Sequence, residues 1–232
     1  MRKLYGIGVG PGDPELLTLR AARVLNEVDR VFAAASSSNE ESAALEIARP
    51  HIRREIPISR LDFPMVRNRE TLETAWEKAA VYVRDNIAPD QTAAFLTLGD
   101  PLIYSTFAYL ARSLAKIDPS LEIEIIPGIT SFQAAAAYLK TSLCEGDEAL
   151  CVLAGTASRD TLKDFLALPA SAAILKVYRN YANIRAALSD TNREKDAILL
   201  SRVAREGERA RPLLEESERP PYMSLIISKK ND

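Results

Sequence analysis

The chain has 232 residues, enough for one large or two small domains, and its 47% hydrophobic and 27% charged residues indicate a soluble protein with a substantial core. Lys and Arg total 30 against 32 for Asp and Glu, so the chain lacks the basic excess that is typical of nucleic-acid-binding proteins. Two cysteines and one histidine are too few for a disulfide framework or a Cys/His zinc site, which favours a reducing, cytoplasmic setting without a protein-bound metal. No signal peptide or membrane-length apolar run is present, so we expect neither a membrane nor a nucleic acid as partner.

In the first half of the chain, strand-like and helix-like segments alternate. Residues 4–8 are a short apolar segment that enters a glycine-rich turn, and residues 15–26 carry apolar side chains at helical spacing. Further strands are predicted at residues 31–34, 93–98 and 122–126, and further helices at residues 42–48, 68–86 and 104–115. Pro127-Gly128 then interrupts the chain, and we predict domains of residues 1–127 and 128–232.

The second half repeats this alternation. Strands are predicted at residues 149–154, 172–177, 197–201 and 223–227, and helices at residues 130–139, 158–166 and 183–188. Residues 205–221 are charged and contain three prolines, which favours a surface loop or a broken helix. Alternating strands and helices in both halves predict a protein of two α/β domains.

The turn after the first strand, residues 6–14 (GIGVGPGDP), is rich in glycine, which tolerates positive φ and lets a ligand approach the backbone. A dinucleotide site would need G-x-G-x-x-G and an acidic residue about 20 positions later, but Asp13 occupies the third glycine position and the second strand ends in alanine. The Gly-Lys-Ser/Thr of a phosphate loop is absent. Single-domain SAM methyltransferases also use G-x-G-x-G turns, yet they too usually place an acid after the second strand.

A second turn, residues 99–101, repeats the Gly-Asp-Pro of residues 12–14 after another predicted strand. Aspartate caps a helix by accepting hydrogen bonds from free N–H groups, and proline fits the first helical position. Capping is the role that we expect for Asp13. For Asp100, capping and ligand contact both stay open, because ligands of open α/β sheets bind at the carboxyl ends of strands.

At these turns the sequence resembles the tetrapyrrole (corrin/porphyrin) methylases. The resemblance is carried by residues 8–21, 99–106 and 127–131. Further segments resemble the branch that methylates C20 of precorrin-2 or cobalt-precorrin-2, namely residues 63–70, 72–77, 96–99, 145–148 and 221–227. Leu98 agrees with this branch, since many other members have glycine there, whereas Tyr178 stands where glycine is expected.

The resemblance implies two α/β domains with a SAM site in the cleft between them, and a homodimer. It implies methyl transfer from S-adenosyl-L-methionine to C20 of precorrin-2 or cobalt-precorrin-2 in cobalamin (vitamin B12) biosynthesis, with any cobalt carried by the substrate. One alternative is a tetrapyrrole methylase of different regiospecificity, such as a uroporphyrinogen III methyltransferase. A second alternative, of another class, is a SAM-sensing module that performs no chemistry.

The resemblance also implies which residues form the site. SAM would contact Pro11, Gly99, Asp100, Ile103, Thr130 and Ser131, and less firmly Val177, Tyr178, Val203 and Ser224. Tyr104 is a candidate catalytic contact, with core packing as the alternative. The many carboxylates of the substrate favour arginine, whose fork binds them in bidentate fashion. The candidate cations are Arg67, Arg69, Lys176, Arg179 and Arg202, each of which could instead be a solvated surface charge.

Overall fold

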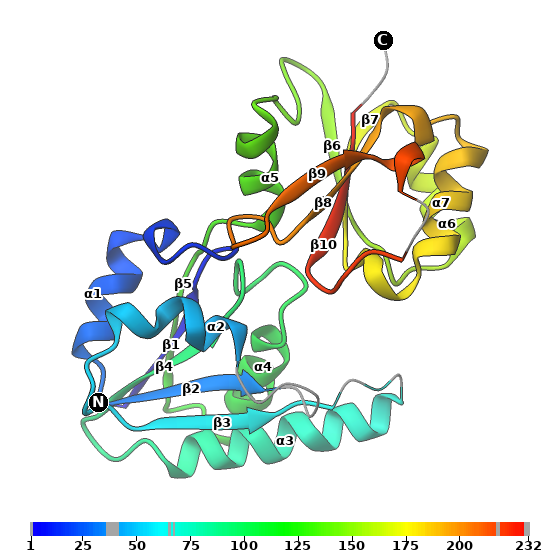
Figure 1. Cartoon of the computed structure of the whole chain (residues 1–232). Coiled ribbons are helices and arrows are strands. Elements are labelled where there is room, and N and C mark those ends of the chain that lie inside the picture. The colour runs from blue at the N-terminus through cyan, green and yellow to red at the C-terminus, as the bar shows by residue number, and fades with distance from the viewer. Residues whose placement is uncertain (1, 36–41, 65, 67, 217–218, 230–232) are drawn as a thin grey trace. The chain divides into compact units, whose positions relative to one another are not determined.

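The computed structural model describes residues 2–35, 42–64, 66, 68–216 and 219–229 (Figure 1). The chain divides into two compact units, Met1–Thr130 and Ser131–Asp232, and this division lies three residues after the break at Pro127. No helix in the described ranges is both long enough and apolar enough to span a membrane.

A five-stranded parallel sheet forms the centre of the first unit, with the strand order β3-β2-β4-β1-β5. The strands are β1 (Lys3–Gly8), β2 (Arg30–Ala35), β3 (Ile58–Asp62), β4 (Thr92–Thr97) and β5 (Glu122–Ile126). β4 lies in the middle of the sheet and reads TAAFLT, almost continuously apolar, as expected for a parallel strand that is covered on both faces.

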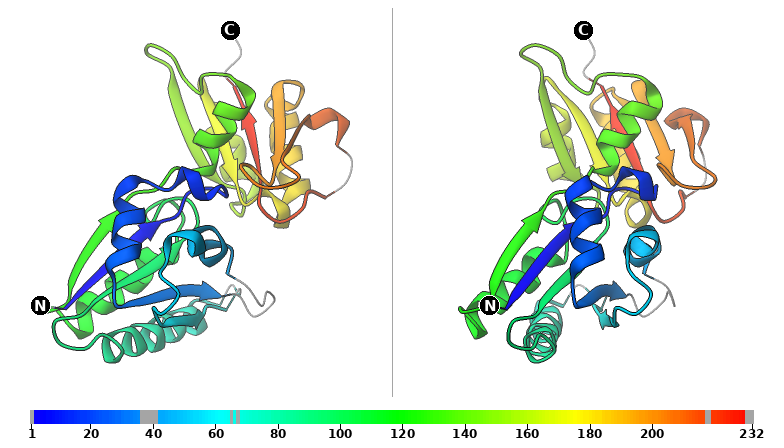
Figure 2. Two further views of the ribbon diagram at one scale, coloured as in Figure 1. Left: turned by 60° about the vertical axis from the view of Figure 1, so that its left-hand side comes forward. Right: turned by 90° about the vertical axis from the view of Figure 1, so that its left-hand side faces the viewer.

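Helices cover both faces of this sheet (Figures 1 and 2). α1 (Leu19–Glu27) and α2 (Ala43–Ala48) pack on one face, and α3 (Arg69–Asp85) and α4 (Phe107–Ile117) pack on the other. Alternate residues of one strand serve the two cores: Leu96 packs with α1 and α2, whereas the neighbouring Phe95 packs with α3 and α4.

The structure corrects two predicted helices in the first unit and adds one strand. The helix predicted at residues 15–26 is divided into a 3-10 turn η1 (Pro14–Leu16) and α1, because the Thr18 hydroxyl caps α1 by accepting a bond from Ala21 N. α4 begins at Phe107 rather than at Tyr104, and residues 98–106 form a loop. β3 was not predicted, since its sequence ISRLD carries polar residues on the exposed side of an edge strand.

The second unit contains a mixed five-stranded sheet with the strand order β6-β7-β10-β8-β9. Its strands are β6 (Ala149–Ala154), β7 (Ala170–Leu175), β8 (Ala197–Ser201), β9 (Arg209–Pro212) and β10 (Ser224–Ser228). β6 and β7 are parallel, while β10 runs antiparallel to both of its neighbours. β9 corrects the prediction that residues 205–221 form only a loop or broken helix, and β7 ends at Leu175, before Val177.

Helices also cover both faces of the second sheet. α5 (Ser131–Leu139) packs on one face, and α6 (Arg159–Leu166) and α7 (Tyr181–Asp190) pack on the other. Short 3-10 turns complete the two units: η2 (Arg49–His51), η3 (Val177–Arg179), η4 (Glu194–Asp196) and η5 (Leu213–Glu215).

Arg193 is a buried charge in the second unit, and hydrogen bonds to neighbouring oxygens hold its side chain. Only 7% of the residue is exposed, and burial lowers the pKa of its guanidinium. The side chain donates to the hydroxyl and carbonyl of Ser228 and to the carbonyls of Leu166, Ala170 and Lys229, at 2.8–3.2 Å. Arg193 therefore joins the end of β10 to the connection between α6 and β7.

Candidate functional site

The most informative place in the first unit is the carboxyl end of β1 and β4. These strands are neighbours, yet α1 follows β1 on one face of the sheet and α4 follows β4 on the other. Such a switch point is where open α/β sheets bind ligands. The two loops meet there in a backbone bridge, in which Gly99 N donates to Gly10 O at 2.8 Å and Gly10 N donates to Gly99 O at 3.3 Å.

Four glycines allow these loops to approach one another closely. We call them the glycine platform: Gly8, Gly10, Gly99 and Gly128. Gly10 and Gly99 have φ values of 80° and 69°, which strongly favour glycine. A Cβ on Gly128 would lie 2.1 Å from Gly99 O, and one on Gly8 would lie 2.5 Å from the same oxygen. The loops after β1, β4 and β5 therefore pack backbone against backbone.

Gly99 differs from its neighbours because one side of it is open. A Cβ built there would meet no atom nearer than Ile129 O, at 4.0 Å. Its positive φ still requires glycine, but the space beside it is not filled by the first unit. The backbone at Gly99 therefore has space beside it, and the contact with SAM that is predicted there stays a prediction.

Asp100 has the capping role that the sequence left open and makes a second hydrogen bond to the loop after β5, while its contact with a ligand stays a prediction. Its Oδ1 accepts from Leu102 N at 2.8 Å, which is the turn-capping bond, and its Oδ2 accepts from Gly128 N at 3.1 Å. Asp13 has the capping role alone, since its Oδ1 accepts from Glu15 N at 2.8 Å. The two Gly-Asp-Pro turns are therefore alike in sequence and unequal in structure.

The loop of residues 98–106, which contains Gly99, carries exposed apolar side chains. Leu102, Ile103 and Tyr104 are 59%, 40% and 45% exposed, a run of apolar surface that a ligand could cover. Tyr104 has φ of 49°, a left-handed conformation that costs roughly 1–3 kcal/mol and is common at ligand sites. Its side chain is exposed, so the core-packing alternative for Tyr104 is wrong.

The base of this loop is anchored by polar side chains. The Thr97 and Ser105 hydroxyls lie 2.7 Å apart, and Ser105 Oγ accepts from Phe107 N at 3.1 Å. The Phe107 ring is fully buried directly against Gly6, where a Cβ would lie 2.2 Å from the ring. Anchoring at both ends holds the exposed residues of the loop in place.

The other predicted SAM contacts of this region are mostly covered. Pro11 is buried in the turn after β1, and Thr130 is 8% exposed. Ser131 is half-buried at the first position of α5. Pro11 and Thr130 follow the glycine platform closely along the chain, so their predicted contacts would be made chiefly by backbone atoms.

In the second unit, strained backbone gathers at one end of the sheet. Lys176, Arg202, Ala204 and Met223 have φ values from 55° to 65° although none is glycine. Because β10 runs antiparallel to β7 and β8, its start lies beside their ends, so these four residues share one edge. We call residues 176–180, 202–205 and 219–223 the β7–β8 end; strain of this kind clusters at functional sites.

Three of the weaker SAM candidates lie at the β7–β8 end and the fourth, Ser224, directly follows it, but three of the four side chains point into the unit. Val177 and Val203 are 0% and 4% exposed and belong to the two hydrophobic cores. Ser224 donates from its hydroxyl to Pro221 O at 2.8 Å and lies 2.8 Å from Ser201 Oγ. Only Tyr178 keeps a partly exposed side chain, so the others could contact a ligand through backbone groups alone.

The predicted substrate cations are divided between the two units. Arg67 lies outside the described residues. The side chain of Arg69 is 88% exposed and pairs with Glu73 one turn along α3, with Nε and Oε1 2.7 Å apart. Lys176, Arg179 and Arg202 are exposed at the β7–β8 end, where partial desolvation lowers the pKa of Lys176.

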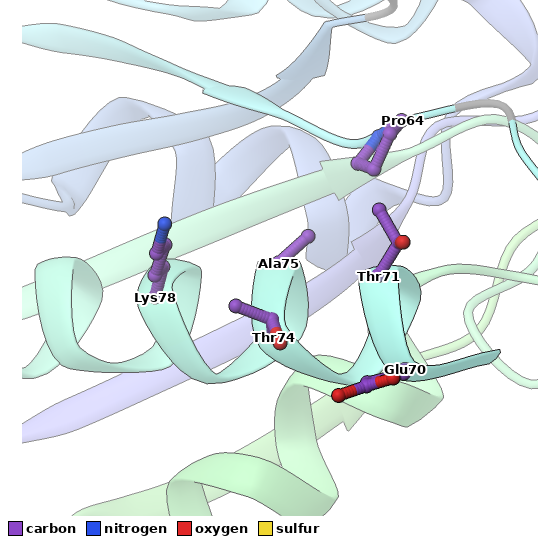
Figure 3. A pocket seen from close by; sticks show the side chains of 6 residues that line it. All are labelled: Pro64, Glu70, Thr71, Thr74, Ala75 and Lys78. Atoms are coloured by element: carbon purple, nitrogen blue, oxygen red, sulfur yellow. The ribbon is translucent and has the colours of Figure 1, made fainter. Parts of the chain in front are cut away.

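Beside Arg69 the surface has an open depression of about 410 Å³, which sequence reasoning did not identify (Figure 3). It is lined by Pro64, Glu70, Thr71, Thr74, Ala75 and Lys78. Lys78 is the cation of this lining, and helical spacing in α3 sets it one turn from Thr74 and two from Thr71. It belongs with the candidate substrate cations of the first unit.

Asn180 is another residue that the sequence did not single out. Its Nδ2 donates to Gly155 O at 2.8 Å and to Ala157 O at 2.9 Å, which ties the loop after β6 to the turn after β7. No sequence pattern marks such a long-range bond. Among the described residues, no group of three or more His, Cys, Asp and Glu side chains is arranged to hold a metal ion.

Comparison with known proteins agrees with the motifs. Residues 3–217 match the family described as Tetrapyrrole (Corrin/Porphyrin) Methylases. The chain is 33% identical to the cobalt-precorrin-2 C(20)-methyltransferase of Salmonella typhimurium, over 98% of this chain and 96% of that protein. It is 32% identical to a precorrin-2 C(20)-methyltransferase of Sinorhizobium sp, over 97% and 94% of the two chains.

Solved structures show the same fold at lower identity. A cobalt precorrin-4 methyltransferase superposes with a TM-score of 0.71 at 19% identity, over 98% of this chain and 94% of that one. The uroporphyrin-III C-methyltransferase of Thermus thermophilus, complexed with S-adenosylhomocysteine, gives 0.66 at 21% identity, over 98% and 97%. With the family match over nearly the whole sequence, these findings show that the chain belongs to the tetrapyrrole (corrin/porphyrin) methylase family.

Proposed function

We propose that this protein is an S-adenosyl-L-methionine-dependent methyltransferase that methylates C20 of precorrin-2 or cobalt-precorrin-2 in cobalamin biosynthesis. The observation that carries the proposal is the similarity to C20-methyltransferases over nearly the full length of the chain. The exposed loop beside the open backbone of Gly99 supports it, since a methyl donor needs a surface at the carboxyl ends of the strands.

The residues of the glycine platform fit a SAM site. SAM supplies an electrophilic methyl group on a sulfonium centre. We propose that Gly99, Asp100 and Ile103 hold it together with Pro11 and backbone groups of residues 130–131. The open side of Gly99 admits a ligand to the backbone, and the apolar loop beside it can exclude water.

The chemical task of the protein is alignment rather than nucleophilic attack. The C20 carbon is itself the nucleophile, because the conjugated pyrrole nitrogens supply it with electron density. Holding two reactants in line can contribute up to roughly 7–11 kcal/mol. A proton leaves C20 after methylation, and we propose Tyr104 as a polar contact near this step, since it is exposed in the same loop as Gly99.

The substrate would be held by cations that meet its peripheral carboxylates. Arg69 and Lys78 in the first unit and Lys176, Arg179 and Arg202 in the second are exposed and can serve this purpose. We further propose a homodimer in the cytoplasm, which sedimentation and cell fractionation would check.

A tetrapyrrole methylase of different regiospecificity is the alternative, because enzymes named for uroporphyrin-III and cobalt precorrin-4 share the fold. Calorimetry with SAM, followed by anaerobic incubation with precorrin-2 and with cobalt-precorrin-2, separates the two. We expect micromolar SAM affinity and one added methyl group, located at C20 by NMR with ¹³C-methyl SAM. Absence of SAM binding would contradict the methylase proposal, and methylation at another carbon would contradict only the C20 assignment.

A further inference from the structure

An aromatic and cationic cluster at the β7–β8 end joins Tyr178 to Arg219 and Tyr222, two residues outside the predicted SAM contacts. Arg219 Nε donates to Tyr178 O at 2.6 Å, and the Arg219 guanidinium carbon lies 4.3 Å from the centroid of the Tyr178 ring. The Tyr222 ring meets the Tyr178 ring edge to face, with centroids 5.9 Å apart, and Tyr222 is 53% exposed. The guanidinium is thus held in one orientation by a hydrogen bond and a stacking contact.

This orientation leaves the two terminal nitrogens of the Arg219 guanidinium available for a ligand. An arginine side chain has five N–H donors, and Nε uses one of them on the Tyr178 carbonyl. Across the described ranges, no carboxylate pairs with the two terminal nitrogens of Arg219. Arg159 and Arg185 show the contrasting case in the same unit, since each is paired with an acid, Asp190 and Glu194 respectively.

A fork of this kind selects its ligand by chemistry. Stacking on a ring and a fixed Nε reduce the entropy that arginine loses on binding, and the two terminal nitrogens match the two oxygens of a carboxylate. The surrounding charges agree, because Lys176, Arg179 and Arg202 share the same end of the sheet. An anionic group with a flat apolar body beside it fits both the fork and the exposed Tyr222.

We propose that Arg219 is a substrate-binding residue whose terminal nitrogens bind a peripheral carboxylate of the tetrapyrrole. This inference rests on the proposed function and adds to it a specificity-determining residue that the sequence motifs do not include. Tyr178 acts as the positioning residue, because its ring and carbonyl set the direction of the fork.

The test compares Arg219→Ala and Arg219→Lys with Arg211→Ala, an exposed arginine on β9 that serves as the matched control. Binding of uroporphyrin III, an octacarboxylic porphyrin, is measured by fluorescence quenching, and the KM for precorrin-2 is measured alongside the Kd for SAM. We expect Arg219→Ala to raise the uroporphyrin Kd and the substrate KM about tenfold, with the SAM Kd unchanged. Arg219→Lys should raise the same two constants by only several-fold, because lysine keeps the positive charge but lacks the two parallel N–H donors of the guanidinium.

A porphyrin with fewer carboxylates separates recognition from general damage. For coproporphyrin III we expect a smaller ratio between the Kd values of Arg219→Ala and wild type than for uroporphyrin III. If both Arg219 variants bind uroporphyrin III within twofold of Arg211→Ala, the inference is overturned. If Arg219→Ala does not fold, the uroporphyrin III Kd of Arg219→Lys relative to that of Arg211→Ala decides the question. Absent SAM binding and methylation in the wild type would instead contradict the proposed function.

Discussion

The Asp100 carboxylate accepts a hydrogen bond from the backbone N–H of Gly128, with Oδ2 and N 3.1 Å apart. This bond joins the loop after β4 to the loop after β5, while the other carboxylate oxygen caps the turn at Leu102 N. One side chain thus fixes two of the segments that the sequence predicts to contact SAM.

Replacing Asp100 by alanine should therefore weaken SAM binding. We expect Asp100→Ala to raise the SAM Kd about tenfold in calorimetry, because hydrogen bonds to a charged group are worth about 1.5–3 kcal/mol. Asp13→Ala is the control, since it removes a turn cap alone. It should cost about 1 kcal/mol of stability and leave the SAM Kd within twofold. Equal losses of affinity in the two variants would show that Asp100 has no special role.

Gly128→Ala tests the backbone packing of the glycine platform. The added Cβ would lie 2.1 Å from Gly99 O, so the loop must shift, and we expect a loss of about 1–3 kcal/mol in urea unfolding with impaired SAM binding. Gly146→Ala is the control, because it imposes the strain of a positive φ without a steric clash. Gly146 has φ of 53°, and no atom lies within 4 Å of the position that an added Cβ would take. It should lose only about 1–2 kcal/mol and bind SAM normally. Normal SAM binding by Gly128→Ala would contradict close packing at the platform.

The arrangement of most elements follows from the sequence, because buried parallel strands such as β1 and β4 are mainly apolar and end at or close to a glycine. The missed strands have a common physical reason. β3 and β9 lie at sheet edges, where one face meets solvent, and their sequences ISRLD and RARP carry no buried-strand pattern. Pairing with a neighbour, which is a long-range property, makes them strands.

The site is predictable to the extent that local conformation encodes it. Positive φ at Gly10 and Gly99 requires glycine, so both turns are visible in the sequence. The bond from Gly128 to Asp100 and the stacking of Arg219 on Tyr178 join residues 28 and 41 positions apart. Nothing in the local pattern reports such contacts.

Arg193→Met should destabilise the second unit strongly. It removes a buried guanidinium and leaves carbonyls such as Ala170 O without their donor, for an expected loss of at least about 3 kcal/mol in urea unfolding. Arg159→Gln is the control, because its pair with Asp190 is exposed and should contribute below about 1 kcal/mol. A loss below about 1 kcal/mol for Arg193→Met would mean that the buried network contributes little net stability.

Asp118 makes the stability of the first unit depend on pH. A hydrogen bond from the Ser120 hydroxyl and the charge of Arg2, opposed by desolvation, lower the Asp118 pKa below its usual 3.8. The ionised form is therefore favoured by folding, and its contribution is present above the unfolded pKa and is lost as pH falls through the folded one.

The corresponding measurement is urea unfolding of wild type and Asp118→Asn between pH 7 and pH 3. We expect the wild type to be the more stable at pH 7, with the difference shrinking as pH falls below about 4. Asp164→Asn, on the exposed face of α6, should stay within about 0.5 kcal/mol of wild type. A difference for Asp118→Asn that does not change with pH would contradict the assignment.

The position of β10 has a consequence for how the protein is made. β10 is the last strand along the chain, yet it lies in the middle of its sheet, between β7 and β8. Before residues 224–228 leave the ribosome, β6 can pair only with β7, and β8 only with β9. All strands of the first unit, by contrast, have been synthesised by residue 126. The glycine platform can therefore form during translation, whereas the β7–β8 end is completed only when synthesis has passed β10.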